Sequence, residues 1–313
     1  MRRDSLRSPG RGVRAAGAPP ERHDTTARCL ELLPVLPADA VFCHITAIAL
    51  LGVDAPRGAD PAGPLHVQTG PGSSRIRRPG VVAHRRADEA VPTVRLRSGL
   101  PVIAPGLAWS QLASTLPLME LVVVGDGLLR RRRPVSTRDD LVAAVRGLPP
   151  GSRGVRRLRE ALAWVRAGTD SPMETRLRVL LVHAGLPCPE VNVLIRDDQG
   201  EVVAMPDLSY PAHRVAIEYD GDIHRVDRGV WRRDIARRQA MEALGWRVIT
   251  CTSDDVHRTP ARTAAWVRAA LARPSGHEWW GSRARTPPLV TARRAGAAAQ
   301  GAAAQDYGRP RAR

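Results

Sequence analysis

Alternation of apolar and charged positions singles out a short strand in the second half of the chain. Residues 215–220 read Val-Ala-Ile-Glu-Tyr-Asp. Because side chains of a strand point alternately to its two faces, Glu218 and Asp220 would share one face with Ala216. The other face would be formed by Val215, Ile217 and Tyr219. Two carboxylates on one strand face repel each other and lose solvation, so this pair indicates a charged site rather than a plain core strand.

The pattern of apolar runs also predicts a small α+β module over residues 28–150. Strand-like apolar runs are expected at 65–69, 80–84, 93–97 and 100–103. Helical runs are expected at 28–33, 40–51, 108–116, 118–129, 137–146 and 154–167. Gly- and Pro-rich stretches separate these runs and predict the loops.

Composition and loop signals divide the remainder of the chain. The predicted segments are a disordered basic tail at 1–27, a helical connector at 151–169, an α/β domain at 170–272 and a disordered Ala-, Gly- and Arg-rich tail at 273–313. The tails lack the apolar positions needed to bury a core.

Two more residues place chemistry beside the predicted strand. Asp207 lies upstream, at the end of what the pattern predicts as the preceding hairpin strand, and His224 lies downstream. Carboxylates that converge at strand ends suit Mg²⁺ (or Mn²⁺), which prefers carboxylate oxygens and water. Asp207, Glu218 and Asp220 are therefore predicted metal ligands. His224 is either a surface residue after the turn or a group for proton transfer near neutral pH. The simpler alternative is turn chemistry, since Pro-Asp and Asp-Gly are common in turns.

These motifs resemble the PD-(D/E)xK nuclease superfamily. Within it the chain is most similar to the very-short-patch-repair (Vsr) endonucleases and the related domain of unknown function 559, over roughly residues 170–272. The resemblance implies a restriction-endonuclease-like three-layer α/β domain with a central mixed sheet, here preceded by the small α+β domain. It also implies a metal-dependent DNA endonuclease. The matching stretches are 171–178, 185–187, 206–207, 214–221, His224, Asp234 with Arg237, and 244–248.

One departure from this family leaves a second function open. The chain contains no lysine, whereas the superfamily motif usually ends in one. Asp220 occupies that position, and the Vsr-like enzymes resemble this chain in having a residue other than lysine there. The alternative is a non-catalytic DNA-binding antitoxin or transcriptional autoregulator that retains the nuclease scaffold. Three carboxylates would repel DNA unless a cation were present, which favours the endonuclease.

The first half of the chain resembles AbiEi-type antitoxins, without their usual winged helix. The resemblance rests on the run from His44 to Ala47, the strand-like pairs and the segment 100–105. It implies a toxin or regulatory protein as a partner, besides DNA. DNA repair, defence and toxin–antitoxin regulation all remain open as the setting.

Glu174 has two explanations that the sequence leaves open. Ser171, Pro172 and Glu174 form an S-x-x-E capping box at a helix start, which alone accounts for the acid. Leu177 and Leu181 follow at i+3 and i+7, so Glu174 also lies on the apolar stripe of that helix. The nuclease resemblance implies a catalytic acid at this position.

Arginines supply the candidates for DNA contact. All 48 basic residues are Arg, and the net charge is +17, which is typical of nucleic-acid binding. However, residues 1–28 and 275–313 each hold seven Arg against three and two acids, so the predicted tails carry 9 of these 17 charges. Arg237 either forms a buried i,i+3 pair with Asp234 or faces phosphate. Four consecutive arginines follow a predicted apolar helix, and they form either a solvated face or a phosphate-binding patch: Arg130, Arg131, Arg132 and Arg133.

The cysteines and the apolar runs exclude several classes of protein. The four cysteines are scattered without a CxxC pair or a ligand-like His spacing, which predicts reduced core residues rather than disulfides or a zinc site. No apolar run reaches the length of a bilayer-spanning helix, and the first residues lack a secretory apolar segment. A cytoplasmic protein is expected.

Overall fold

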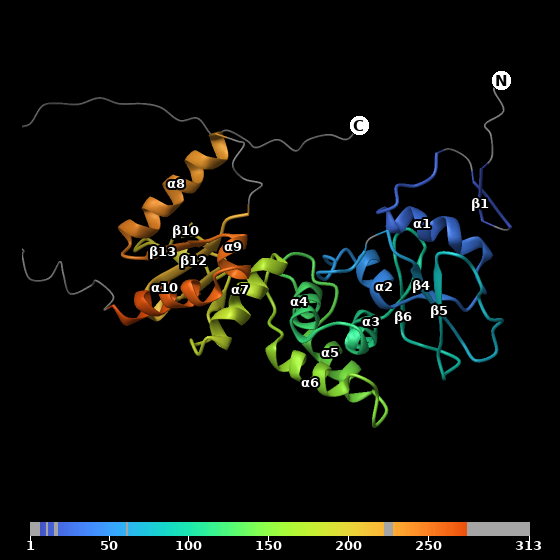
Figure 1. Cartoon of the computed structure of the whole chain (residues 1–313). Coiled ribbons are helices and arrows are strands. Elements are labelled where there is room, and N and C mark those ends of the chain that lie inside the picture. Colours follow the sequence, from blue (N-terminus) through green and yellow to red (C-terminus); the bar gives the residue numbers. More distant parts are fainter. Residues whose placement is uncertain (1–6, 11, 16–17, 61, 222–227, 274–313) are drawn as a thin grey trace, which may run out of the picture. The chain divides into compact units, whose positions relative to one another are not determined.

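A five-stranded mixed sheet organises the first part of the chain (Figure 1). The computed structural model describes residues 7–10, 12–15, 18–60, 62–221 and 228–273. The strands run in the order β5-β4-β3-β7-β6, with β3–β4 and β6–β7 antiparallel and β4–β5 and β3–β7 parallel. Their bounds are Val41–Phe42 (β3), Leu65–Thr69 (β4), Val81–Arg85 (β5), Thr93–Arg95 (β6) and Pro101–Ile103 (β7). Four of them fall within or beside the predicted runs, and β3 lies inside a run that the sequence predicted as helical.

Helices pack against this sheet and form one apolar cluster with it. Trp109 lies at its centre, fully buried, and its indole N–H donates to the carbonyl of Leu121 at 2.8 Å. The helices are Thr25–Leu32 (α1), His44–Leu50 (α2), Pro105–Gln111 (α3), Leu118–Leu128 (α4), Arg138–Arg146 (α5) and Val155–Trp164 (α6). Leu158 and Ala161 of α6 belong to the cluster, so the helix predicted within a connector packs into this core.

The residues predicted as an N-terminal tail contain a short strand pair. Arg7–Gly10 (β1) and Val13–Ala15 (β2) are antiparallel. The predicted C-terminal tail falls almost entirely outside the described residues, which end at residue 273.

The second part of the chain is built on a four-stranded mixed sheet of order β13-β12-β11-β8. Strands β11–β12 and β11–β8 are antiparallel, whereas β12–β13 is parallel. The strands are Glu190–Val191 (β8), Leu208–Tyr210 (β11), Val215–Tyr219 (β12) and Arg247–Cys251 (β13), with a separate hairpin of Ile195–Arg196 (β9) and Val202–Ala204 (β10). The helices are Pro172–His183 (α7), Arg228–Ala243 (α8), Ser253–His257 (α9) and Pro260–Ala272 (α10).

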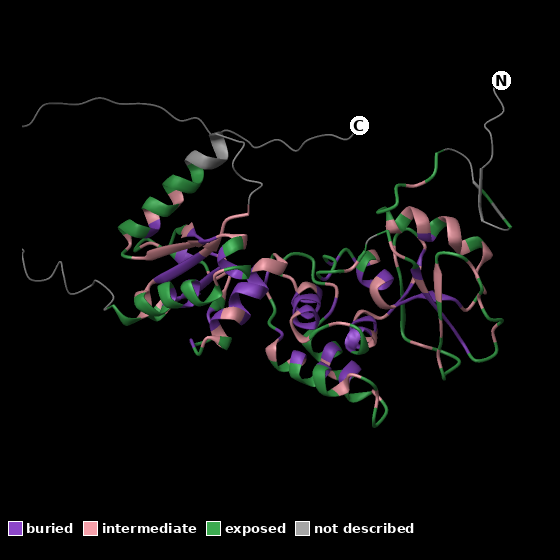
Figure 2. Cartoon of the chain, in the orientation of Figure 1, coloured by how far each residue is buried: buried purple, intermediate pink, exposed green. Residues whose placement is uncertain are grey.

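Helices cover both faces of this sheet. Val215 and Ile217 pack with α7, α9 and α10 on one face, and Ala216 packs with Met241 of α8 on the other. Figure 1 shows α8 and α10 on opposite sides of the strands, and Figure 2 shows the outward surface of α10 as largely exposed. The predicted alternation along β12 is thereby confirmed. The protein is a mixed α/β structure, as the sequence predicted at that coarse level.

Polar contacts at the α8–β13 turn fix the parallel register of β12 and β13. Arg214 precedes β12 in the left-handed region, with φ 49°, and its Nη1 donates to the carbonyl of Leu244 at 2.9 Å. Gly245 has φ 77°, a conformation that favours glycine. A Cβ at this position would approach Arg214 Nη1 to 3.1 Å. The turn therefore requires glycine for both conformation and space.

Helix α7 contributes to both apolar clusters and is held to α4 by buried ion pairs. Arg178 Nη2 lies 2.7 Å from Asp126 Oδ2, and their side chains are 1% and 0% exposed. Arg176 makes a second pair with Glu120, at 2.7 Å. Residues Met1–Ser275 form one compact unit. Among the described helices, none combines the length and apolar character that crossing a bilayer requires.

Candidate functional site

Three carboxylates from three elements converge at one edge of the four-stranded sheet. Glu174 lies in the first turn of α7, Asp207 immediately before β11, and Glu218 near the end of β12. The antiparallel register pairs Leu208 with Ile217, which places Asp207 opposite Glu218. Asp207 Oδ2 also accepts the backbone N–H of Tyr219 at 2.7 Å. Asp207 was predicted at the end of a preceding hairpin strand, but it lies immediately before the start of β11, and the hairpin β9–β10 is separate.

The Glu174 side chain turns inward, although the helix start is capped as predicted. Ser171 Oγ accepts the N–H of Glu174 at 3.2 Å, which completes the serine half of the capping box. The Glu174 carboxylate accepts the N–H of Asp170 and the side-chain amide of Asn192, each at 2.9 Å. Glu174 is only 4% exposed. It therefore stabilises the local turn and lies within electrostatic range of Asp207.

The electrostatics of this edge disfavour three ionised acids. Burial raises the pKa of Glu174 to about 7, and the charge of Asp207 adds to that rise. Burial likewise raises the pKa of Asp207 to about 6, with a further contribution from the charge of Glu218. The pKa of Glu218 is also raised by burial, although Arg237 opposes the rise. Buried carboxylates of this kind are typical of sites that bind a cation or move a proton.

Arg237 contacts the site directly. Its Nη2 lies 3.0 Å from Glu218 Oε1 and 3.6 Å from Asp234 Oδ1. The predicted i,i+3 pair of Asp234 with Arg237 is therefore formed, but the two side chains are 51% and 40% exposed, so it is not buried as predicted. The short Glu218 contact is a charge contact without hydrogen-bond geometry, because among the described residues Glu218 Oε1 and Arg237 Nε are buried without a hydrogen-bond partner. Glu218 Oε1 is thus a buried carboxylate oxygen that accepts no hydrogen bond from the described residues, which suits an atom that coordinates a cation.

Of the remaining predicted site residues, Asp220 lies near the end of the described segment 62–221. The Asp220 N–H donates to the carbonyl of Cys251 at 2.8 Å, and the Asp220 charge contributes to the raised pKa of Glu218. His224 lies outside the described residues. Among the residues that are described, these carboxylates do not form a group of three ligand atoms within 4.8 Å.

We expect Glu174→Gln to stabilise the protein at alkaline pH. The folded-state pKa of Glu174, about 7, exceeds its ordinary value of 4.5, so the native state binds the proton more tightly. The contribution of this protonated carboxyl to the unfolding free energy is fully present below pH 4.5 and is lost as the pH rises through 7. The variant should gain roughly 1–3 kcal/mol in unfolding free energy at pH 8 and little at pH 4. Urea unfolding at both pH values, with the exposed Glu242→Gln as control, measures this; an equal effect at both would contradict it.

Half of the predicted arginine patch is engaged within the protein. Arg130 donates to the carbonyls of Gly52 and Arg133, and Arg131 pairs with Asp170. Arg132 and Arg133 are exposed. A DNA contact by this run remains a prediction that rests on those two side chains.

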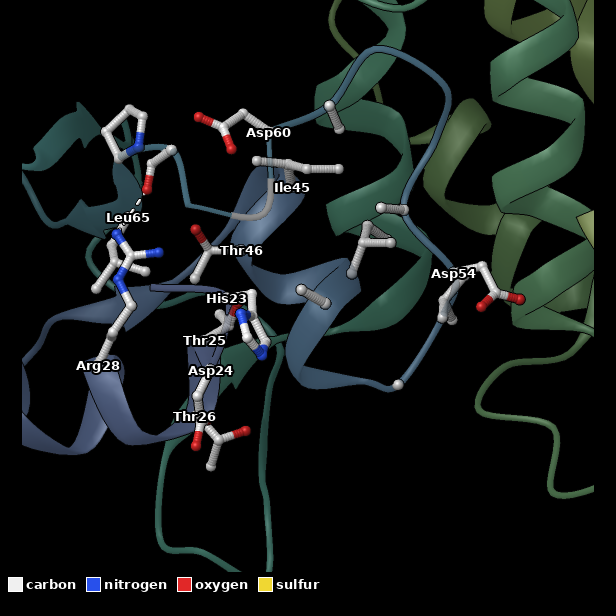
Figure 3. Close-up of a pocket in the computed structure, with 18 residues that line it drawn as sticks. His23, Asp24, Thr25, Thr26, Arg28, Ile45, Thr46, Asp54, Asp60 and Leu65 are labelled. Atoms are coloured by element: carbon white, nitrogen blue, oxygen red, sulfur yellow. Dashed lines mark hydrogen bonds between the residues drawn. The ribbon is translucent and has the colours of Figure 1, made fainter. Parts of the chain in front are cut away.

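A pocket of about 440 Å³ lies elsewhere, in the first part of the chain. Figure 3 shows it between the start of α1, α2 and the loop that leads to β4. Two of its polar side chains serve local structure: Asp24 caps α1 through the N–H of Ala27, and Asp60 accepts the N–H of Ala62. None of the site residues predicted from the sequence lines this pocket, so it is distinct from the carboxylate edge.

The sequence interpretation missed a group of sulfur and imidazole ligands. All four cysteines are free, as predicted, but Cys188 is exposed and is not a core residue. Cys43 lies with His44 and His84 in a group whose ligand atoms are within 4.8 Å of one another. The prediction that the cysteines are core residues rather than zinc ligands did not take this group into account. No spacing along the chain marked this group, because Cys43 and His44 lie between β3 and the start of α2 whereas His84 lies in β5, about forty residues later.

Two proteins of Mycobacterium tuberculosis resemble the chain along most of its length. Uncharacterized protein MT2308 (strain CDC 1551) and Uncharacterized protein Rv2248 (strain H37Rv) are each 29% identical to it over 263 residues, which is 84% of this chain and 91% of the relative. A match of that length includes residues of both sheets. No family model and no solved structure matches the chain.

Proposed function

We propose that the chain is a metal-dependent DNA endonuclease that hydrolyses phosphodiester bonds. The convergence of Glu174, Asp207 and Glu218, all with raised pKa values, carries this proposal. Helices on both faces of a mixed sheet agree with the restriction-endonuclease-like fold that the sequence resemblance implies. The setting, whether DNA repair, defence or toxin–antitoxin regulation, is left open.

In this proposal each acid has a defined task. Asp207 and Glu218, with Asp220, would hold Mg²⁺ or Mn²⁺ through their carboxylate oxygens. Such an ion would supply a water of lowered pKa and offset charge on the scissile phosphate. Glu174 exchanges a proton near neutral pH, since its pKa is about 7. His224 is retained as a second candidate for that step.

Arg237 compensates in part for the absence of lysine. Its guanidinium lies 3.0 Å from Glu218 and brings a fixed positive charge to the site. An arginine stays protonated and cannot act as a base, so its role is to attract and orient the phosphate. Exposed arginines elsewhere, such as Arg132 and Arg133, add salt-sensitive affinity for the DNA backbone.

Arg237→Gln should slow cleavage on the order of 10²-fold, because a preorganised positive charge beside the phosphate is lost. Arg233→Gln, an exposed arginine of the same helix, is the matched control and should leave the rate within about twofold of wild type. Single-turnover cleavage rates measure both effects. Equal rates for the two variants would remove Arg237 from the site.

Cleavage of supercoiled and linear DNA by the purified chain tests the proposed activity. We expect nicking with Mg²⁺ or Mn²⁺ and none with EDTA. Salt-sensitive DNA binding without cleavage under any of these conditions would overturn the nuclease proposal.

That outcome would favour a second function, a DNA-binding antitoxin or transcriptional autoregulator. The specific observation in its favour is the Arg237–Glu218 contact, because an internal cation already offsets one of the predicted metal ligands. In that case the acids and Arg237 form a structural charge cluster, and a toxin or another regulatory protein is the expected partner besides DNA.

A further inference from the structure

Four sulfur and imidazole side chains gather in the N-terminal part of the chain. Cys43 follows β3, His44 is the first residue of α2, His66 lies in β4, and His84 lies in β5. In the parallel β4–β5 pair, His66 is opposite Val82 and His84 is opposite Gln68, so both histidines project from the same face of the sheet. Three segments distant in sequence thus supply one cluster.

The contacts within this cluster are close. His44 Nδ1 lies 3.2 Å from Cys43 Sγ, and His66 Nδ1 lies 3.0 Å from His84 Nε2. One ligand atom each from Cys43, His44 and His84 lies within 4.8 Å of the others. The His44 and His84 rings are stacked, with centroids 3.8 Å apart and planes at 16°.

The backbone holds His44 in a conformation that histidine rarely adopts. Its φ is 51°, in the left-handed region. The His44 N–H donates to Gln111 Oε1 at 3.0 Å, and Gln111 Nε2 donates to Gln68 Oε1 at 2.6 Å. Backbone strain of this kind is concentrated at functional sites. Two glutamines therefore fix the residue at the centre of the cluster.

The chemistry of the cluster is that of neutral electron-pair donors. Uncharged imidazoles beside a buried thiol have lone pairs available for a cation, and the ligand group among the described residues contains no carboxylate.

We propose that Cys43, His44 and His84 form a binding site for a transition-metal ion of the Zn²⁺ class, with His66 hydrogen-bonded behind His84. Thiolate and imidazole are the preferred ligands of Zn²⁺, Co²⁺ and similar ions. Tetrahedral bonds of about 2.0–2.3 Å place ligand atoms roughly 3.3–3.8 Å apart, so the group must contract slightly. One of the stacked rings must rotate to direct its nitrogen to the ion.

The His66–His84 contact has the geometry of a supporting hydrogen bond. A ligand histidine commonly hydrogen-bonds through its second ring nitrogen, which fixes its tautomer and raises its basicity. The bound ion would link the β3–α2 junction to β5, across the strand β4. This site rests on residues other than the carboxylate edge and is independent of the proposed nuclease activity.

Metal content and Co²⁺ spectra of the full chain, purified without a histidine tag, test the proposal. We expect one Zn²⁺ per chain by mass spectrometry. Chelation followed by Co²⁺ should produce a thiolate-to-cobalt charge-transfer band and tetrahedral d–d bands in the wild type. His84→Gln should weaken Zn²⁺ at least tenfold, and His66→Phe should weaken it 10–100-fold. Cys43→Ser should abolish the charge-transfer band.

Controls separate this site from other metal sites and from loss of folding. Cys188→Ser and His23→Asn alter an exposed cysteine and an exposed histidine and should leave binding unchanged. Asp207→Asn should also retain the cobalt spectrum. Because Cys43 is buried and its variant can fail to fold, the wild-type spectrum and His84→Gln decide the matter. A wild-type chain that binds no Zn²⁺ and gives no thiolate–cobalt band overturns the proposal, as does unchanged affinity in His84→Gln.

Discussion

Replacing Asp207 by Asn should reduce DNA cleavage on the order of 10³-fold while the protein stays folded. Asp207 is the acid shared by the whole site, since it lies opposite Glu218 and its charge raises the pKa of Glu174. The amide loses the charge that holds a divalent ion, which accounts for the loss of rate. Single-turnover cleavage at saturating Mg²⁺ measures it.

The same substitution should preserve or increase stability, and this separates a site residue from a structural one. The amide oxygen of the introduced side chain can still accept the Tyr219 N–H, whereas the repulsion from Glu218 disappears. Asp254→Asn is the matched control, because Asp254 forms an exposed pair with Arg258. A rate for Asp207→Asn within tenfold of wild type, or a large loss of stability, would contradict the assignment.

The largest effect on stability should follow from breaking the buried pair between α4 and α7. Asp126 accepts hydrogen bonds from Arg178, from the Thr175 hydroxyl and from the N–H of Arg166, at 2.7–2.8 Å. Asp126→Ala leaves the Arg178 guanidinium buried without its partner, which typically costs about 3–5 kcal/mol. Denaturant unfolding should show this loss.

Two further variants test the cause of that loss. Arg258→Ala removes an exposed pair with Asp254 and should change the unfolding free energy by less than about 1 kcal/mol. The double variant Asp126→Leu with Arg178→Met removes both charges and should be more stable than Asp126→Ala. A cost below about 1 kcal/mol for Asp126→Ala would show that water reaches the pair.

The sequence predicted which residues of β12 share a face because that information is local. Alternation along β12 assigned Val215 and Ile217 to one face and Ala216 to the other, and the structure confirms both assignments. The capping box at Ser171 was also local, and its serine half is formed. Periodicity and capping depend on neighbours within one turn or strand, so one sequence contains them.

Features that depend on strand pairing could not be predicted. Strand β3 has only two residues and precedes α2 directly, so its apolar positions continue the helical pattern. His66 and His84 meet through the parallel pairing of β4 with β5, and a sequence does not state which strands pair. The contact of Arg237 with Glu218 likewise joins α8 to β12, where the helical pattern alone favoured Asp234. Contacts between distant segments therefore form the cysteine–histidine cluster, which the sequence interpretation missed. They also place the Arg237 charge beside Glu218 at the carboxylate edge.

The central claim is that the carboxylate edge binds a divalent cation, and Mn²⁺ binding followed by the electron paramagnetic resonance of the free ion tests it most directly. This measurement requires no knowledge of the DNA substrate. Two proteins are compared: the His84→Gln variant and the double variant that also carries Asp207→Asn. His84→Gln is present in both because it limits binding at the cysteine–histidine cluster. The account predicts Mn²⁺ uptake that Mg²⁺ displaces and that Asp207→Asn weakens at least tenfold. Identical isotherms for the two proteins would contradict it.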